Sequence, residues 1–103
     1  MPVFVMEYIR GNVPREIGRS RWVVRPVGDC PVAYPRPEAI ARIASACFGQ
    51  SCYVDGISGQ GAWKNAVIIV IPTESEPVIR DMFLRRLAER IEHAANSGGA
   101  TDN

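Results

Sequence analysis

Residues 3–9, VFVMEYI, form a short and mostly apolar run that predicts a strand. Within residues 3–9, the side chains of Phe4, Met6 and Tyr8 fall on one side and the intervening residues on the other. The run RWVVRP at residues 21–26 is short and rich in β-branched residues, which predicts a second strand or an extended arm. The chain is therefore expected to begin with two extended segments.

Two later segments carry apolar residues at helical spacing. Residues 37–48 place apolar side chains at i, i+3, i+4, i+7 and i+8, Pro37 fits the first turn, and Gly49 offers a C-terminal stop. A second helix, with Pro77 in its first turn, is predicted to end near Asn96. Its inward stripe is apolar. The residues of this helix that we expect to face water are Arg85, Glu89, Glu92 and His93.

The remaining segments complete a two-layer fold. Residues 52–57 predict a strand, residues 58–65 a glycine-containing loop, and residues 66–71 a central strand, because their apolar run does not alternate. The order of elements predicts one α+β domain over residues 1–96, a two-layer sandwich in which a mixed sheet of about four strands carries two helices on one face. The small, polar tail at residues 97–103 is expected to be disordered.

The net charge and the length of the apolar runs argue against nucleic-acid and membrane partners. Twelve basic and eleven acidic residues give a net charge of +1, so we do not expect a nucleic-acid-binding protein. The longest apolar run, residues 66–72, is far shorter than the roughly 20 residues of a membrane span, and the first residues lack a charged segment before an apolar one. We therefore expect a soluble, cytoplasmic protein with no membrane partner. A sheet this small exposes an edge strand, which predicts a homo-oligomer.

Reactive side chains are few. His93 is the single histidine, so neither a histidine-ligated metal site nor a Ser/His/Asp triad is expected, and no cofactor is predicted. The three cysteines are an odd number, which argues against a disulfide framework. Cys47 is more simply explained as a small apolar residue that packs in the interior.

Pro2 is the most specific candidate for chemistry. Removal of the initiator Met1 would leave a secondary amine at the start of the first strand. An α-amino group has a pKa of about 7.7 to 8.0, and burial or nearby cations lower it. A neutral amine at physiological pH can serve as a general base. Six arginines in the first 36 residues can supply the cations and hold an anionic substrate: Arg10, Arg15, Arg19, Arg21, Arg25 and Arg36.

The opening MPVFVMEY, residues 1–8, resembles the start of tautomerase superfamily proteins, in particular the 5-carboxymethyl-2-hydroxymuconate isomerases. Residues 66–91 are similar to a later strand and helix of that superfamily. The resemblance implies an isomerase, commonly a trimer, in which Pro2 is the base for a small carboxylate-bearing enol or keto substrate. It also implies that Arg10, and secondarily Arg36, bind the substrate carboxylate. The simpler alternative is that Pro2 only follows the start residue on an edge strand.

Two other functions remain open. Residues 52–72 resemble the strand, glycine loop and strand of the PII-type and CutA-type ferredoxin-like trimers, which implies a regulatory module that binds a small ligand. Backbone amides at Gly59 and Gly61 could cradle an anion beside Lys64, although a plain hairpin loop also explains these residues. The arginine-rich segment at residues 10–36 alternatively fits a small protein-interaction or inhibitor protein.

Overall fold

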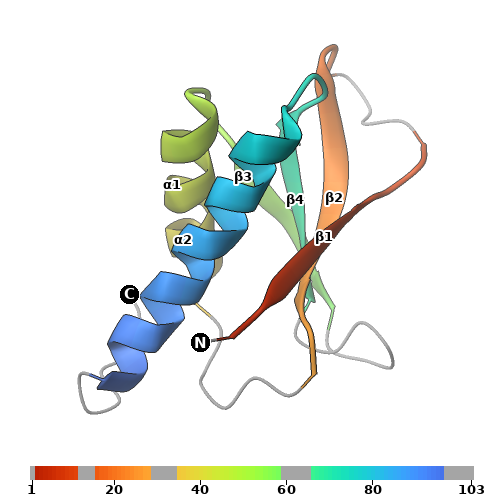
Figure 1. Ribbon diagram of the computed structural model, residues 1–103. Helices are drawn as coiled ribbons and strands as arrows, with labels where there is room; N and C mark the ends of the chain where they lie inside the picture. The colour runs from red at the N-terminus through yellow and green to blue at the C-terminus, as the bar shows by residue number, and fades with distance from the viewer. Residues whose placement is uncertain (1, 12–15, 29–34, 59–65, 97–103) are drawn as a thin grey trace.

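A four-stranded sheet and two helices form the protein (Figure 1). The computed structural model describes residues 2–11, 16–28, 35–58 and 66–96. All six predicted elements are present, and their bounds are β1 Phe4–Tyr8, β2 Arg19–Pro26, α1 Pro37–Phe48, β3 Tyr53–Ser58, β4 Ala66–Pro72 and α2 Pro77–Asn96. The predicted tail at residues 97–103 and the predicted glycine loop lie outside the described residues, apart from Ser58 at the end of β3.

The strands lie in the order β1-β2-β4-β3, and each of these three pairings is antiparallel. The prediction of a mixed sheet is corrected here. β2 and β3 run parallel to each other, but β4 lies between them and pairs with both. The segment β2-α1-β3 is therefore a split β-α-β unit. The non-alternating strand is central, as predicted, since β4 has a partner on each side.

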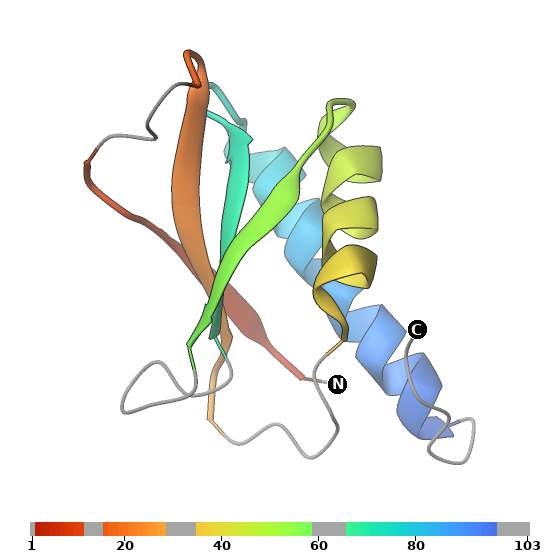
Figure 2. The same ribbon diagram turned by 180° about the vertical axis from the view of Figure 1, so that it is seen from behind.

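Both helices cover the same face of the sheet, which confirms the two-layer α+β sandwich (Figures 1 and 2). α1 packs mainly on β3, and α2 lies against α1 and reaches β1. Alternate residues of each strand point into this layer, and the helices add their apolar stripes. The largest fully buried side chains are Phe83, Ile40, Ile69, Ile71, Leu87, Ile91, Val24 and Val70.

The ends of α1 follow from its sequence. Pro37 occupies the first turn, where a missing backbone N–H costs no helical hydrogen bond. Gly49 ends the helix with φ of 69°, a left-handed conformation that glycine adopts without steric cost. Its N–H donates to the Ser45 carbonyl at 3.0 Å. The chain then turns directly into β3, which places the end of α1 beside the start of that strand.

Candidate functional site

Pro2 lines a small pocket between the start of β1 and the middle of α2. The pocket has a volume of about 180 Å³, and its lining is Pro2, Val3, Phe4, Leu84, Arg85 and Ala88. Two contacts fix this geometry. Val27 N–H donates to the Val3 carbonyl at 2.8 Å, which holds the beginning of β1 against β2. Phe4 is 6% exposed and anchors the strand in the core shared with α2.

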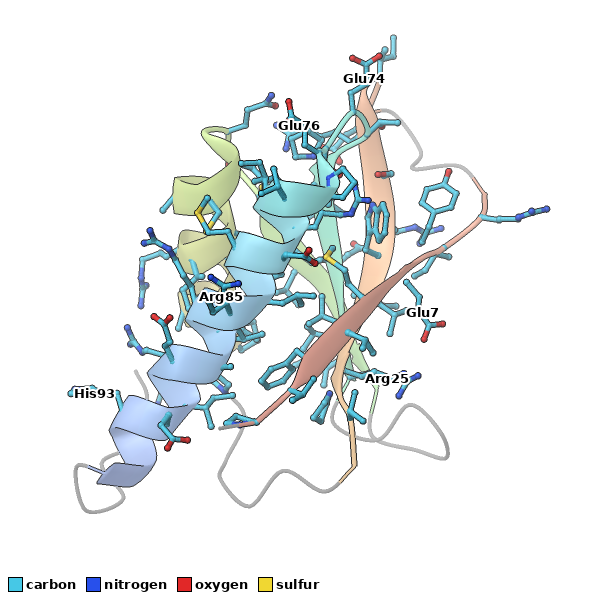
Figure 3. The ribbon with its side chains drawn as sticks, in the orientation of Figure 1. Glu7, Arg25, Glu74, Glu76, Arg85 and His93 are labelled. Atoms are coloured by element: carbon cyan, nitrogen blue, oxygen red, sulfur yellow. The ribbon has the colours of Figure 1, made fainter. Side chains whose placement is uncertain are left out.

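Arg85 supplies the charge in this pocket. It is exposed on α2 (Figure 3), as the sequence predicts. It also borders the apolar wall that surrounds Pro2. Within the described part of the chain, Arg85 forms no ion pair with a carboxylate. Its guanidinium therefore has free donors that could bind a carboxylate or phosphate of a ligand.

Arg10 does not reach Pro2 within one chain. Ile9 N–H donates to the Arg21 carbonyl, and Val27 N–H donates to the Val3 carbonyl, so the first strand stays extended between these points. Arg10 lies eight residues after Pro2, which at about 3.3 Å per residue separates their backbones by roughly 26 Å.

Arg36 lies nearer to the Pro2 end of the molecule. It is exposed and immediately precedes α1. The beginnings of α1 and β1 lie at the same end of the fold (Figures 1 and 2). Arg36 does not line the Pro2 pocket, whereas Arg85 does. The sequence signal for Arg85 is its place between Leu84 and Ala88, at the border of the apolar stripe of α2.

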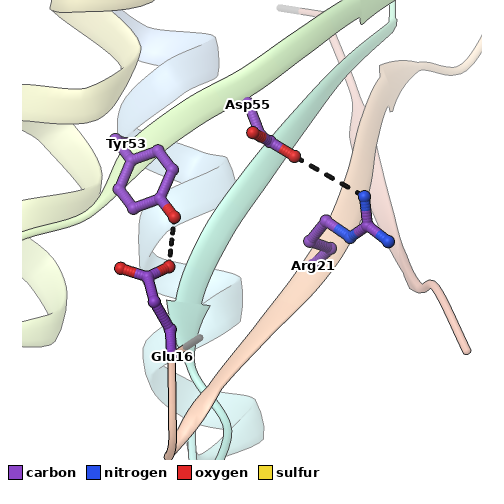
Figure 4. Close-up of polar contacts among 4 residues, drawn as sticks. All are labelled: Glu16, Arg21, Tyr53 and Asp55. Atoms are coloured by element: carbon purple, nitrogen blue, oxygen red, sulfur yellow. Dashed lines mark hydrogen bonds and ion pairs between the residues drawn. The ribbon is translucent and has the colours of Figure 1, made fainter. Parts of the chain in front are cut away.

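The arginines of β2 lie on the sheet face opposite the helices, away from Pro2. Arg25 pairs with Glu7 of β1 at 3.0 Å (Figure 3). Arg21 reaches across β4 to Asp55 of β3 at 3.6 Å (Figure 4). These pairs are partly exposed, where ion pairs contribute about 0 to 1 kcal/mol. The predicted cationic segment is therefore interleaved with acidic residues on this face.

A larger pocket lies between β1, β2 and the first turns of α2. Its volume is about 330 Å³, and its lining is Phe4, Val5, Met6, Trp22, Pro77, Arg80, Asp81 and Leu84. Trp22 forms one wall, and its Nε1–H donates to Ser20 Oγ at 2.9 Å. The guanidinium carbon of Arg80 lies 4.8 Å from the centre of the Trp22 ring. The sequence analysis did not single out Arg80, although it begins the i, i+4, i+8 row with Leu84 and Ala88 that faces β1.

The two cysteines that the structure describes, Cys47 and Cys52, show no activation of their thiols. Cys47 lines a third pocket, of about 240 Å³, between the end of α1 and the start of α2. Burial raises the pKa of the Cys47 thiol, and the charge of Arg86 opposes this shift in part. Burial likewise raises the pKa of Cys52, which is 5% exposed. Raised thiol pKa values are typical of structural cysteines rather than nucleophiles.

The structure does not describe the remaining predicted site residues. Gly59, Gly61 and Lys64 of the predicted anion loop lie outside the described residues, as does Met1. In the described ranges, no group of three or more His, Cys, Asp or Glu residues could hold a metal ion. Neither described helix has the length and apolar character needed to cross a membrane.

Searches with the chain against protein-family models, curated proteins and solved structures each returned no match.

Proposed function

We propose that this protein is a tautomerase-like isomerase in which Pro2 is the general base and Arg85 binds the carboxylate of a small enol or keto acid. The observation that carries the proposal is that Pro2 and Arg85 line one small, otherwise apolar pocket. Arg85 takes the role that the resemblance gives to Arg10, because Arg10 lies at the far end of the extended first strand.

The surroundings of Pro2 favour a neutral amine. Apolar walls disfavour a charged ammonium group, and a nearby guanidinium repels it, so both effects lower an amine pKa. The proposal requires that Met1 is removed, since an amide nitrogen cannot accept a proton. The substrate carboxylate then binds Arg85 through two parallel N–H···O hydrogen bonds, which fix its orientation.

The reaction needs only a proton transfer. The Pro2 nitrogen accepts the proton of the enol hydroxyl, and the O–H bonding electrons form the carbonyl double bond. The former carbon–carbon double bond takes the proton back from the Pro2 ammonium, which regenerates the neutral amine. Atoms and electrons balance without an oxidant or a cofactor.

Intact-mass spectrometry and turnover of phenylenolpyruvate test the proposal together. Active protein should lack Met1, and Pro2→Ala should lower kcat by at least about 100-fold, the usual share of a general base. Arg85→Gln should raise KM by about tenfold or more, because charged hydrogen bonds contribute about 1.5 to 3 kcal/mol. Arg86→Gln, an exposed neighbour outside the pocket, is the matched control and should leave both constants unchanged. Full turnover in Pro2→Ala, or retained Met1 in active protein, would overturn the proposal.

A regulatory module that binds a small anion is the second candidate. The split β-α-β unit and the strand order β1-β2-β4-β3 support it. Moving β1 to follow α2 would give the element order of the ferredoxin-like fold, to which the PII-type and CutA-type trimers belong. Stabilisation by adenine nucleotides without enol turnover, lost in Lys64→Ala, would favour this candidate.

Self-association belongs to both proposals. β1 and β3 each pair on one side within the described sheet. Their other edges offer backbone groups to a second copy. Light scattering on purified protein gives the subunit number, and a monomer at micromolar concentration would count against an oligomer.

A further inference from the structure

The larger pocket, beside Trp22 and Arg80, has the features of a second ligand site. It is separate from the Pro2 pocket, although Phe4 and Leu84 contribute to both linings. Its volume of about 330 Å³ is at the small end of the range for ligand pockets. Its walls are mainly apolar, and two adjacent residues of opposite charge, Arg80 and Asp81, line it from α2.

Arg80 is held in one orientation by contacts on two sides. Its Nη1 donates to the Ser75 carbonyl and to Ser75 Oγ, the latter at 3.0 Å. Its guanidinium lies over the Trp22 ring, and that ring is itself fixed by the hydrogen bond to Ser20. No described residue accepts a hydrogen bond from Nε or Nη2 of Arg80. This free edge of the guanidinium matches the two oxygens of a carboxylate.

The carboxylate of Asp81 disfavours binding of a ligand that carries only negative charge in this pocket. It is exposed, and among the described residues it forms no ion pair with a cation. Because its carboxylate lines the same pocket as Arg80, an anionic ligand would be attracted by one residue and repelled by the next. A ligand with a carboxylate and an ammonium group on one carbon satisfies both charges.

We propose that this pocket binds a free α-amino acid with an apolar side chain. Arg80 receives the carboxylate, Asp81 the ammonium group, and Phe4, Met6 and Leu84 surround the side chain beside Trp22. Each part of the ligand meets a group of matching chemistry. The pocket therefore recognises zwitterions in preference to amphiphiles that carry only one of the two charges.

Isothermal titration calorimetry with L-phenylalanine and L-leucine tests the site. L-Phenylalanine should bind at least about tenfold more tightly than 3-phenylpropionate, which lacks the ammonium group, or phenethylamine, which lacks the carboxylate. No binding heat from either amino acid at about 10 mM, a concentration that would fill a millimolar site, would overturn the proposal. Equal affinity for L-phenylalanine and 3-phenylpropionate would also overturn it.

Two variants locate the binding. Asp81→Asn removes an exposed, unpaired charge, so it should fold normally and abolish the preference for L-phenylalanine over 3-phenylpropionate. Glu89→Gln on the same helix is its matched control and should keep the preference. Arg80→Lys keeps the charge but loses the planar fork, and it should weaken L-phenylalanine binding by about tenfold. An unchanged preference in Asp81→Asn would place the ligand elsewhere and refute the assignment. These readouts are independent of enol turnover at Pro2, so the two proposals fail separately.

Discussion

Ser45 joins α1 to the start of β3, and its replacement by alanine should destabilise the fold by a definable amount. Its Oγ accepts a hydrogen bond from the Cys52 backbone N–H at 2.9 Å and donates to the Ala41 carbonyl at 2.7 Å. The Cys52 carbonyl is farther away, at 3.4 Å, so the single hydroxyl proton is directed to Ala41. Cys52 is 5% exposed, and water cannot readily replace the lost acceptor.

The expected magnitude combines two opposing effects. Ser45→Ala leaves the buried Cys52 N–H without its acceptor, which costs about 1 to 3 kcal/mol. Alanine is better than serine in a helix interior by roughly 0.5 kcal/mol, which offsets part of this loss. The net destabilisation is therefore about 0.5 to 2.5 kcal/mol. For a domain of this size, a loss of about 1.5 kcal/mol lowers Tm by roughly 6 to 12 °C.

Urea unfolding, followed by circular dichroism, measures this difference in the free energy of unfolding. Ala46→Ser, at the next and exposed position of α1, is the control for helix propensity and should cost only about 0.5 kcal/mol. A Ser45→Ala variant as stable as the unmodified protein would refute the reasoning, because it would show that the Cys52 N–H does not depend on Ser45.

Two titrating features give further predictions. The Tyr53 hydroxyl donates to the Glu16 carboxylate, and this hydrogen bond raises the pKa of the phenol (Figure 4). The stabilisation from this pair should be complete below the unfolded pKa of about 10 and be lost as pH rises through the higher folded value. Ultraviolet titration measures the pKa of the Tyr53 phenol, and the Tyr53→Phe variant identifies its contribution to the spectrum. This pKa should fall in Glu16→Gln, and an unchanged value would contradict the assignment. Burial raises the pKa of Cys47 and Cys52, so both should react with iodoacetamide more slowly than a cysteine peptide at neutral pH, and half-buried Cys47 should react before Cys52. Peptide mass mapping measures both rates, and equal rates at the two cysteines would count against the difference in burial.

The elements of the fold follow from the sequence because each depends on local periodicity. The apolar spacing within residues 37–48 and the proline at its start define α1, and the non-alternating residues 66–71 mark the central strand β4. Strand order is different, because periodicity does not state which strand pairs with which. β4 lies between β2 and β3, and its pairing with β2 joins segments that are more than 40 residues apart in the chain. The local pattern therefore predicted the two-layer arrangement correctly, but it did not predict that all the strand pairings are antiparallel.

In the candidate site, too, the sequence indicates residues by their local pattern but not the contacts between residues that are distant in the chain. Pro2 is evident from its place directly before the first predicted strand. The resemblance assigns the substrate carboxylate to Arg10, yet the extended first strand carries Arg10 far from Pro2. Arg85 reaches the pocket only because α2 crosses beside β1. Such a contact between residues distant in the chain has no signature in spacing alone.

The composition of one row of α2 explains why two of the three pockets described above lie beside β1. Arg80, Leu84 and Ala88 follow one another at i, i+4 and i+8 and face the strand. Leu84, in the middle, packs against the core and fills the space next to Phe4. Arg80 lines the larger pocket at one end of the row, and Ala88, which is 4% exposed, lines the Pro2 pocket at the other end. Leu84 therefore contributes an apolar wall to both pockets.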